Sequence, residues 1–202
     1  YTPIFQSARL SSALGLKQLW FKDESGNPSA SFKDRASAVA LARAKEIGAE
    51  VIVAASTGNA GAATACLAAA MNMPAIILAP HNAPPAKIAR LLIFGARVIL
   101  VDGSYDDAFD LSIAATQAFG WYNRNTGYNP FTTEGKKTAA FEIWEQLILK
   151  QLPENAPLNL FIPVGDGNII SGIYKGFYDL YQLGWIKKMP RLFGVQSQGS
   201  AA

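Results

Sequence analysis

The sequence predicts an α/β protein in which parallel strands alternate with helices in two lobes. Short apolar runs alternate with longer stretches of helical periodicity, and strands joined by such helices pair in parallel. Glycines also stand where helix C-caps are expected. The chain has 202 residues, of which 50% are hydrophobic and 16% charged, so it can bury a substantial core.

The first block of elements covers residues 19–119. A β-forming run predicts a short strand, turn-forming residues follow it, and then helices alternate with apolar runs. Gly48, Gly95 and Gly120 are placed where three of the helices should end. Strands are expected at 19–24, 51–55, 75–79 and 98–101, and helices at 32–47, 60–71, 84–94 and 106–119.

Segment 123–134 is rich in turn-forming residues, and we expect it to be irregular. Beyond it, helices are expected at 135–149 and 169–183, and strands at 158–164 and 192–195. We therefore expect two lobes. Residues 1–50 begin the larger lobe with the helix over 32–47, residues 51–125 form the smaller lobe, and residues 126–202 return to the larger lobe.

Composition and charge exclude several classes of protein. The net charge is only +3, and the basic residues are scattered, which disfavours a nucleic-acid partner. A single cysteine, Cys66, fits a reducing compartment, and a single histidine, His81, argues against a metal site. No apolar run approaches the roughly 18 residues of a membrane span. We expect a cytoplasmic protein that acts on a small molecule, without membrane or metal.

The stretch "SASFKDRAS" places a cation at the start of a helix. Ser31 as N-cap, with Asp34 completing a capping box, puts Lys33 in the first turn. The helix dipole disfavours a positive charge there by about 0.3 to 1 kcal/mol, and burial would favour a neutral, nucleophilic amine. Such an amine can form a Schiff base. The alternative is a solvated lysine beside Asp34 and Arg35.

The stretch "STGNAGAA" forms a turn between a predicted strand and an Ala-rich helix. Glycine lets a ligand approach the backbone, and free N–H groups at a helix start favour an anion such as a carboxylate. Ser56, Thr57 and Gly58 are the candidates for that contact, and Asn59 adds a neutral side chain that can bond a ring hydroxyl. The alternative is an ordinary connection between a strand and a helix.

The stretch "PVGDGNIISG" again joins a strand to a helix. Its backbone amides and helix start can bind one phosphate, and the candidate residues are Gly165, Asp166, Gly167, Asn168 and Ile169. A dinucleotide fingerprint would need glycine at position 170, where Ile170 stands, so NAD is disfavoured. No nucleotide-triphosphate P-loop occurs either.

An amine, an asparagine-bearing anion loop and a cup for one phosphate are jointly what pyridoxal 5'-phosphate requires. The three stretches resemble the tryptophan synthase β-like superfamily of fold type II pyridoxal-phosphate enzymes. "GARVILVDGSYDDA" and "NPFTTEGKKTAAFEIWEQL" are most similar to the threonine synthase family, and the similarity spans nearly the whole chain. The resemblance implies a cytoplasmic lyase of threonine biosynthesis, an amino-acid biosynthesis pathway, that converts O-phosphohomoserine and water to threonine and phosphate.

The resemblance also implies roles for individual residues. Lys33 would be the Schiff-base lysine and proton carrier, and Asn59 the partner of the 3-hydroxyl of the cofactor. Residues 165–169 would hold the phosphate of the cofactor. Ser56, Thr57 and Gly58 would bind the carboxylate of a small amino-acid substrate. Homodimers are usual among such enzymes, so a homodimer is expected here.

Two departures from the family leave alternatives open. Relatives often carry an arginine for the substrate phosphate where this chain has Thr132, although Lys87, Lys136 or Lys137 can compensate. A serine/threonine dehydratase or ammonia-lyase of the same fold is therefore the runner-up. The chain also looks C-terminally incomplete, without the group that faces the pyridine nitrogen, so a noncatalytic remnant is a third possibility. A nucleotide-dependent oxidoreductase is a fourth.

Overall fold

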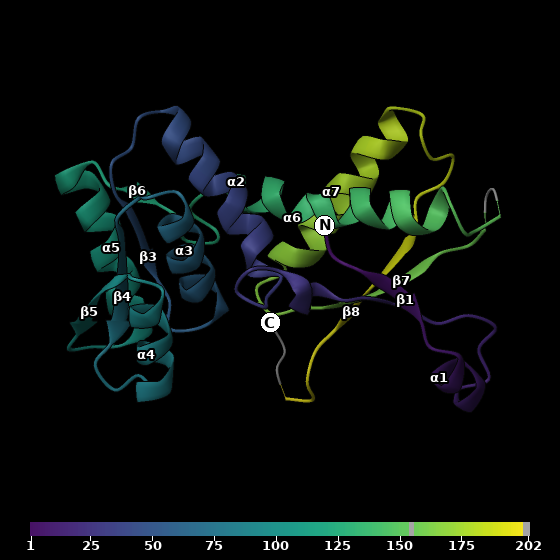
Figure 1. Ribbon diagram of the computed structural model, residues 1–202, viewed down its shortest axis with the longest axis horizontal. Helices are drawn as coiled ribbons and strands as arrows, with labels where there is room; N and C mark the ends of the chain where they lie inside the picture. The colour runs from purple at the N-terminus through teal and green to yellow at the C-terminus, as the bar shows by residue number, and fades with distance from the viewer. Residues whose placement is uncertain (154–155, 200–202) are drawn as a thin grey trace. The chain divides into compact units, whose positions relative to one another are not determined.

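A computed structural model describes residues 1–153 and 156–199 (Figure 1). The strands are β1 (Ile4–Gln6), β2 (Trp20–Lys22), β3 (Ile52–Ala55), β4 (Ala75–Pro80), β5 (Arg97–Val101), β6 (Tyr122–Asn123), β7 (Asn159–Pro163) and β8 (Arg191–Val195). The helices are α1 (Ala8–Ala13), α2 (Lys33–Glu46), α3 (Asn59–Ala70), α4 (Pro85–Ile93), α5 (Tyr105–Phe119), α6 (Phe131–Ile143) and α7 (Asn168–Gln182). A 3-10 turn, η1 (Glu24–Gly26), and a π-helical segment, η2 (Trp144–Ile148), complete the order.

The alternation of strands and helices predicted from the sequence is confirmed. The predicted strands and helices are all present. The glycines expected at three helix ends have positive φ angles, which are 74° at Gly48, 81° at Gly95 and 69° at Gly120. β1, α1 and β6 were not predicted from the sequence, and α6 begins four residues earlier than predicted. These elements are short or begin inside the segment that was expected to be irregular.

The chain divides into two compact units, residues 31–136 and residues 1–30 with 137–202. These units begin and end at other residues than the lobes expected from the sequence, and α2 belongs to the unit of residues 31–136. The assignment of lobes therefore stays a prediction. No helix among residues 1–153 and 156–199 is both long and apolar enough to cross a membrane.

The unit of residues 31–136 contains a four-stranded parallel sheet in the order β5-β4-β3-β6. β3 pairs with β4 from Ile52 opposite Ala75, and with β6 from Ile52 opposite Tyr122. Because side chains alternate along a strand, β3 buries one set of residues on each face. The sheet therefore has two apolar faces, and each needs a layer of helices to cover it.

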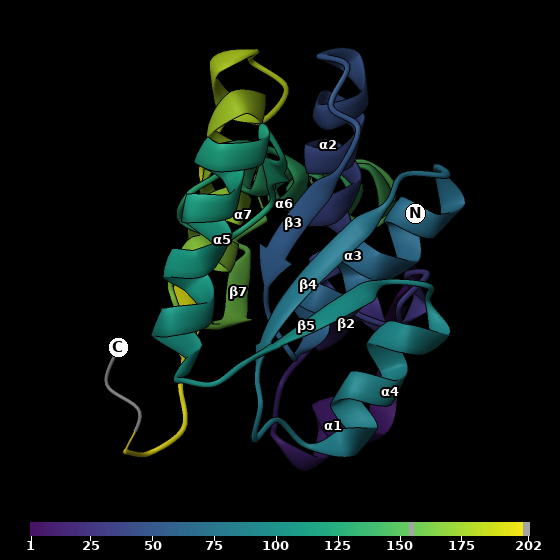
Figure 2. The same ribbon diagram turned by 90° about the vertical axis from the view of Figure 1, so that its left-hand side faces the viewer.

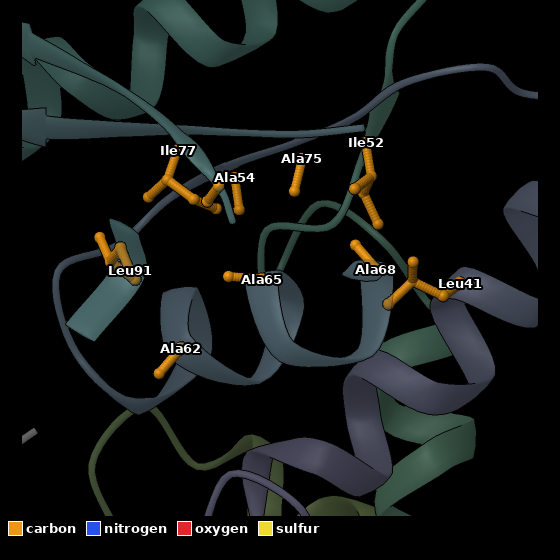
Figure 3. Packing of buried hydrophobic residues seen from close by; sticks show 10 residues of the cluster. Leu41, Ile52, Ala54, Ala62, Ala65, Ala68, Ala75, Ile77 and Leu91 are labelled. Carbon is orange, nitrogen blue, oxygen red and sulfur yellow. The ribbon is translucent and has the colours of Figure 1, made fainter. Parts of the chain in front are cut away.

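Helices cover both faces of this sheet. α2, α3 and α4 pack on one face, where Leu41, Ala65 and Leu91 meet Ile52 and Ile77 of the strands (Figure 3). On the other face Ala108 of α5 packs against the alternate residues of β3 and β4, and Figure 2 shows α5 and α3 on opposite sides of the strands. This layering places the starts of α2 and α3 on the same side of the sheet.

The unit of residues 1–30 and 137–202 has two small sheets. β1 and β2 pair antiparallel, and β7 and β8 pair in parallel. α6 and α7 approach closely, because a Cβ on Gly176 would lie 2.4 Å from the Lys137 carbonyl oxygen. The N-terminal segment is tied to α6 by Lys22, whose Nζ donates to Glu142 Oε2 at 2.6 Å and to Gln146 Oε1 at 3.0 Å.

Candidate active site

Lys33 is the first residue of α2 and is half-buried. The Lys33 N–H donates to Ser31 Oγ at 3.0 Å, and the Asp34 N–H donates to the Ser31 carbonyl at 3.2 Å. The predicted capping box is wrong, because the Asp34 N–H bonds a backbone oxygen rather than the Ser31 hydroxyl. The predicted place of Lys33 in the first turn is confirmed, at the end of the helix where the dipole opposes a positive charge.

The start of α6 lies directly against this first turn. A Cβ on Gly135 would lie 2.1 Å from the Arg35 carbonyl oxygen, so the two backbones meet where a side chain would not fit. Asp34 and Arg35 are themselves buried, with exposed fractions of 2% and 7%. The turn that carries Lys33 is therefore part of a packed interior rather than a solvated helix end.

Charged side chains of α2 and α4 act on Cys66 of α3. Burial raises the pKa of the Cys66 thiol above its ordinary value, the Asp34 carboxylate raises this pKa further, and the Arg90 guanidinium opposes both. A carboxylate on α2 and a guanidinium on α4 therefore lie within electrostatic range of the same thiol.

The loop between β3 and α3 presents its backbone and Asn59 to the surface. The Ser56 N–H donates to the Leu78 carbonyl at 3.2 Å, and the Gly58 N–H donates to Ser56 Oγ at 3.2 Å. Among residues 1–153 and 156–199, a Cβ on Gly58 would meet nothing within 4 Å, so a ligand can approach the loop there. Arg90 Nη1 donates to Asn59 Oδ1 at 3.2 Å, which leaves the amide nitrogen of Asn59 as the donor for a ligand oxygen.

Two asparagine contacts fix the end of β3 just before this loop. Asn125 Oδ1 accepts the Ala55 N–H at 2.8 Å, and Asn125 Nδ2 donates to Ser112 Oγ of α5 at 2.7 Å. Asn129 Nδ2 donates to the Asn123 carbonyl at 2.8 Å, which closes the turn that carries Asn125. The backbone of Ala55, the residue before Ser56, is therefore held by the Asn125 side chain as well as by its pairing with β4.

The glycine loop between β7 and α7 belongs to the unit of residues 1–30 and 137–202. Gly167 is the N-cap of α7 and has a φ of 76°, a conformation that favours glycine. As a glycine it has no side chain that could cap the helix. The Asn168 N–H donates to Asp166 Oδ1 at 3.0 Å, so the carboxylate of Asp166 turns back onto the helix start. A Cβ on Gly165 would meet no atom of the described residues within 4 Å. Backbone N–H groups of this loop and of the first turn of α7, up to Ile169, can therefore donate to a ligand beside Gly165.

The three lysines that can replace the family arginine differ in their surroundings. Thr132 itself is fully buried, and its hydroxyl donates to the Asn129 carbonyl at 2.8 Å. Lys137 Nζ lies 3.1 Å from Asp179 Oδ2, and Lys87 is exposed on α4. Lys136 is fully buried and lies one helical turn after Thr132. Lys136 is therefore the cation on the same face of α6 as Thr132.

Sequence reasoning missed Arg90 and Asn125 as supports of the site. Arg90 lies 31 residues from Asn59, and nothing in the local pattern of α4 signals that contact. The pair Asn123 and Asn125, two residues apart in a turn-rich segment, was a usable signal, because asparagine side chains commonly bond backbone groups in turns. The structure brings both asparagines into the interior.

Comparison with known proteins identifies relatives over the full length of the chain. The family model described as "Pyridoxal-phosphate dependent enzyme" matches residues 1–202. A threonine synthase from Methanocaldococcus jannaschii is 39% identical over 98% of this chain and 48% of its own length. A threonine synthase from Bacillus sp. is 41% identical over 100% of this chain and 55% of its own length. The chain thus spans about half the length of the curated relatives it matches.

Solved structures share the fold at lower identity. The processed form of threonine deaminase isoform 2 from Solanum lycopersicum superposes with a TM-score of 0.80 at 24% identity, over 96% of this chain and 50% of that one. This likeness shows the fold type II architecture, and the predicted fold class is confirmed. With the family model matching from the first residue to the last, the chain belongs to the family of pyridoxal-phosphate dependent enzymes.

Proposed function

We propose that the protein is a lyase of threonine synthase type, which converts O-phosphohomoserine and water to threonine and phosphate. The observation that carries this proposal is the identity of 39% and 41% to threonine synthases over nearly the whole chain. Because the matched relatives are about twice as long, the proposal concerns the full-length protein.

The residues present fit pyridoxal phosphate. Lys33 supplies an amine on a packed helix start, and Asn59 supplies an amide nitrogen whose partner oxygen is already held by Arg90. The loop over 165–169 offers backbone donors and open space beside Gly165 for a phosphate. When bound, this cofactor supplies an electron sink for negative charge at the α-carbon of an amino acid.

The side chains of the chain itself would bind the substrate and move its protons. We assign to Lys33 Nζ the removal of the proton at the α-carbon and its return at a later step. The N–H groups at the start of α3, with Ser56, Thr57 and Gly58, would bind the carboxylate of the substrate. The side-chain and backbone contacts of Asn125 and Leu78 keep this loop at the end of β3.

Lys136 is our candidate for the cation that binds the phosphate of the substrate. Lys136 lies four residues after Thr132 on α6 and is fully buried, whereas Lys87 is exposed on α4. A buried ammonium binds an anion more strongly than an exposed one, because water screens it less. If Lys136 has another role, the dehydratase reaction becomes the better assignment, since its substrates carry no phosphate.

Product analysis of the full-length protein tests the proposed reaction. With O-phosphohomoserine we expect threonine and inorganic phosphate in equal amounts, and no 2-oxo acid from serine or threonine. Release of ammonia and a 2-oxo acid from serine or threonine, with O-phosphohomoserine unchanged, would replace the proposal with a dehydratase. A protein that binds pyridoxal phosphate but converts none of these substrates would be a noncatalytic remnant.

We also propose a cytoplasmic homodimer without a nucleic-acid partner. The single cysteine and the modest charge of +3 support the compartment and the absence of a nucleic-acid partner. Light scattering at several concentrations would measure the oligomeric state. A monomeric mass at all concentrations would contradict the homodimer.

A further inference from the structure

A chain of buried polar side chains joins β6, α2 and α3. Arg124, directly after β6, donates from Nε to Ser37 Oγ of α2 at 3.0 Å. Ser37 Oγ lies 3.4 Å from Thr64 Oγ1 of α3, and Thr64 Oγ1 bonds the Ala60 carbonyl at 2.8 Å. The exposed fractions of Arg124, Ser37 and Thr64 are 1%, 0% and 0%. Polar groups buried this completely are retained in a core only with partners.

The chemistry of the groups fixes the direction of this chain. A carbonyl oxygen only accepts, so Thr64 donates its hydroxyl proton to Ala60. A guanidinium only donates, so Ser37 accepts from Arg124. The proton between the two hydroxyls must therefore come from Ser37. The sequence of donors runs from Arg124 through Ser37 and Thr64 to the Ala60 carbonyl, next to Asn59.

This chain connects the two helices that begin with the proposed cofactor residues. Ser37 lies four residues after Lys33, one turn along α2. The Ala60 carbonyl belongs to the residue that follows Asn59, in the first turn of α3. The Ser37 to Thr64 contact is therefore one of the contacts that hold α2 against α3 near their first turns, and it contributes to the spacing between Lys33 and Asn59.

We propose that Ser37 and Thr64 are positioning residues for the cofactor, which fix the spacing between the Lys33 amine and the Asn59 amide. The inference rests on the proposed function. In pyridoxal phosphate the aldehyde that reacts with an amine and the 3-hydroxyl that an amide would bond are on adjacent ring atoms. Both contacts can form together only if the two side chains are held at one spacing, and a displacement of about 1 Å is costly to such a site.

The test measures which part of the cofactor loses its contact. The full-length protein is prepared as wild type, Ser37→Ala, Thr64→Val and Thr64→Ser, and the dissociation constants for pyridoxal phosphate and its 3-deoxy analogue are compared. Thr64→Val keeps the shape and removes the hydroxyl, whereas Thr64→Ser keeps the hydroxyl. We expect Ser37→Ala and Thr64→Val to reduce the preference for the natural cofactor by about tenfold, the value of one good hydrogen bond, and Thr64→Ser to retain it.

A matched control separates positioning from stability. Ser11 Oγ of α1 donates to the Ser7 carbonyl at 2.8 Å, the same bond to the residue four positions earlier that Thr64 makes, and Ser11 is also buried. Ser11→Ala should lower the unfolding midpoint of the cofactor-free protein without changing the ligand preference. The double variant Ser37→Ala, Thr64→Val is also compared with the two single variants in the cofactor-free protein. Its loss in free energy of unfolding should be smaller than the sum of the losses of the single variants.

The outcomes are distinct for this inference and for the proposed function. If the wild type binds both ligands equally, or if Lys33 forms no covalent adduct, the proposed cofactor contacts are wrong. If the wild type prefers the natural cofactor and Thr64→Val and Ser37→Ala retain that preference, the inference on Ser37 and Thr64 is overturned. If both ligands lose the same factor in every variant, including Ser11→Ala, the two residues act only on stability and the inference is overturned as well.

Discussion

The side-chain oxygens of Ser37 and Thr64 lie 3.4 Å apart, in the contact between the helix that begins at Lys33 and the helix that begins at Asn59. Both side chains are completely buried. The residues assigned to the cofactor thus stand at helix starts, while the residues that hold these helices together lie one or two turns inside. Rigid support of this kind is what a site needs to hold reactive groups in one geometry.

Two glycines should respond in opposite ways to alanine. In the part of the chain that the structure describes, a Cβ on Gly165 meets nothing within 4 Å, whereas a Cβ on Gly176 would lie 2.4 Å from the Lys137 carbonyl oxygen. We expect Gly165→Ala to leave the free energy of unfolding unchanged and to weaken binding of pyridoxal phosphate, because the methyl group occupies the space assigned to the phosphate. Gly176→Ala should cost about 1 to 3 kcal/mol of stability. Denaturant titration and cofactor titration measure the two effects separately.

Asp166 places a negative charge at the start of α7, where we assign a phosphate. Its Oδ1 accepts the Asn168 N–H at 3.0 Å, and an asparagine oxygen can accept the same bond. Asp166→Asn should therefore keep the turn and remove the repulsion, so that inorganic phosphate and pyridoxal phosphate bind about two- to fivefold more tightly at low salt. The gain should shrink as ionic strength rises. Weaker binding in this variant would contradict the placement of the phosphate.

The reactivity of Cys66 should report on the charges of Asp34 and Arg90. Burial raises the pKa of this thiol, the Asp34 carboxylate raises it further, and Arg90 lowers it. Only the thiolate reacts with iodoacetamide, so labelling of the folded protein should reach half its maximal rate at a higher pH than labelling of the unfolded chain. Asp34→Asn should move this midpoint to lower pH, and Arg90→Gln should move it to higher pH. Shifts in the same direction would contradict the arrangement.

The same raised pKa has a consequence for stability. The folded protein holds the proton of Cys66 at a pH where the unfolded chain has lost it. The free energy of unfolding should therefore fall as the pH rises above the ordinary pKa of a thiol. Cys66→Ala should remove this part of the alkaline decline.

Lys136 and Lys137 allow a matched test of the cation for the substrate phosphate. Lys136 is fully buried, and Lys137 pairs with Asp179 at 3.1 Å. We expect Lys136→Gln to raise the KM for O-phosphohomoserine by about tenfold or more, as loss of a charged hydrogen bond does. Lys137→Gln should lower stability and leave this KM nearly unchanged. An unchanged KM in a folded Lys136→Gln protein would remove Lys136 from the site and favour the dehydratase reaction.

The sequence was sufficient for elements whose signal is local. The apolar runs that became β3, β4 and β5 are bounded by glycines and turn residues, and their bounds were predicted to within one residue. The start of a helix at Lys33 was predicted correctly, although its N-cap is Phe32 rather than Ser31. Signals of this kind depend on neighbours in the chain, and the structure confirms them because tertiary contacts did not override them.

The features that were not predicted from the sequence depend on contacts between residues far apart in the chain. β6 has only two residues, Tyr122 and Asn123, and it exists because it pairs with β3. Arg124 would ordinarily be expected at the surface. It is instead buried and donates to the Ser37 hydroxyl, 87 residues away in the sequence. The sequence predicted a capping box with Ser31 as the N-cap, but the Asp34 N–H donates to the Ser31 carbonyl instead of the Ser31 hydroxyl. None of these partners can be read from a local pattern.

The most direct test is the identity of the lysine that reacts with the cofactor. The full-length protein is mixed with pyridoxal phosphate, reduced with borohydride and digested, and the modified peptide is located by mass spectrometry, with Lys33→Ala treated in parallel. We expect one stoichiometric adduct on Lys33 and none in the variant. A reducible adduct of equal yield in Lys33→Ala, or a wild-type adduct on another lysine, would contradict the account.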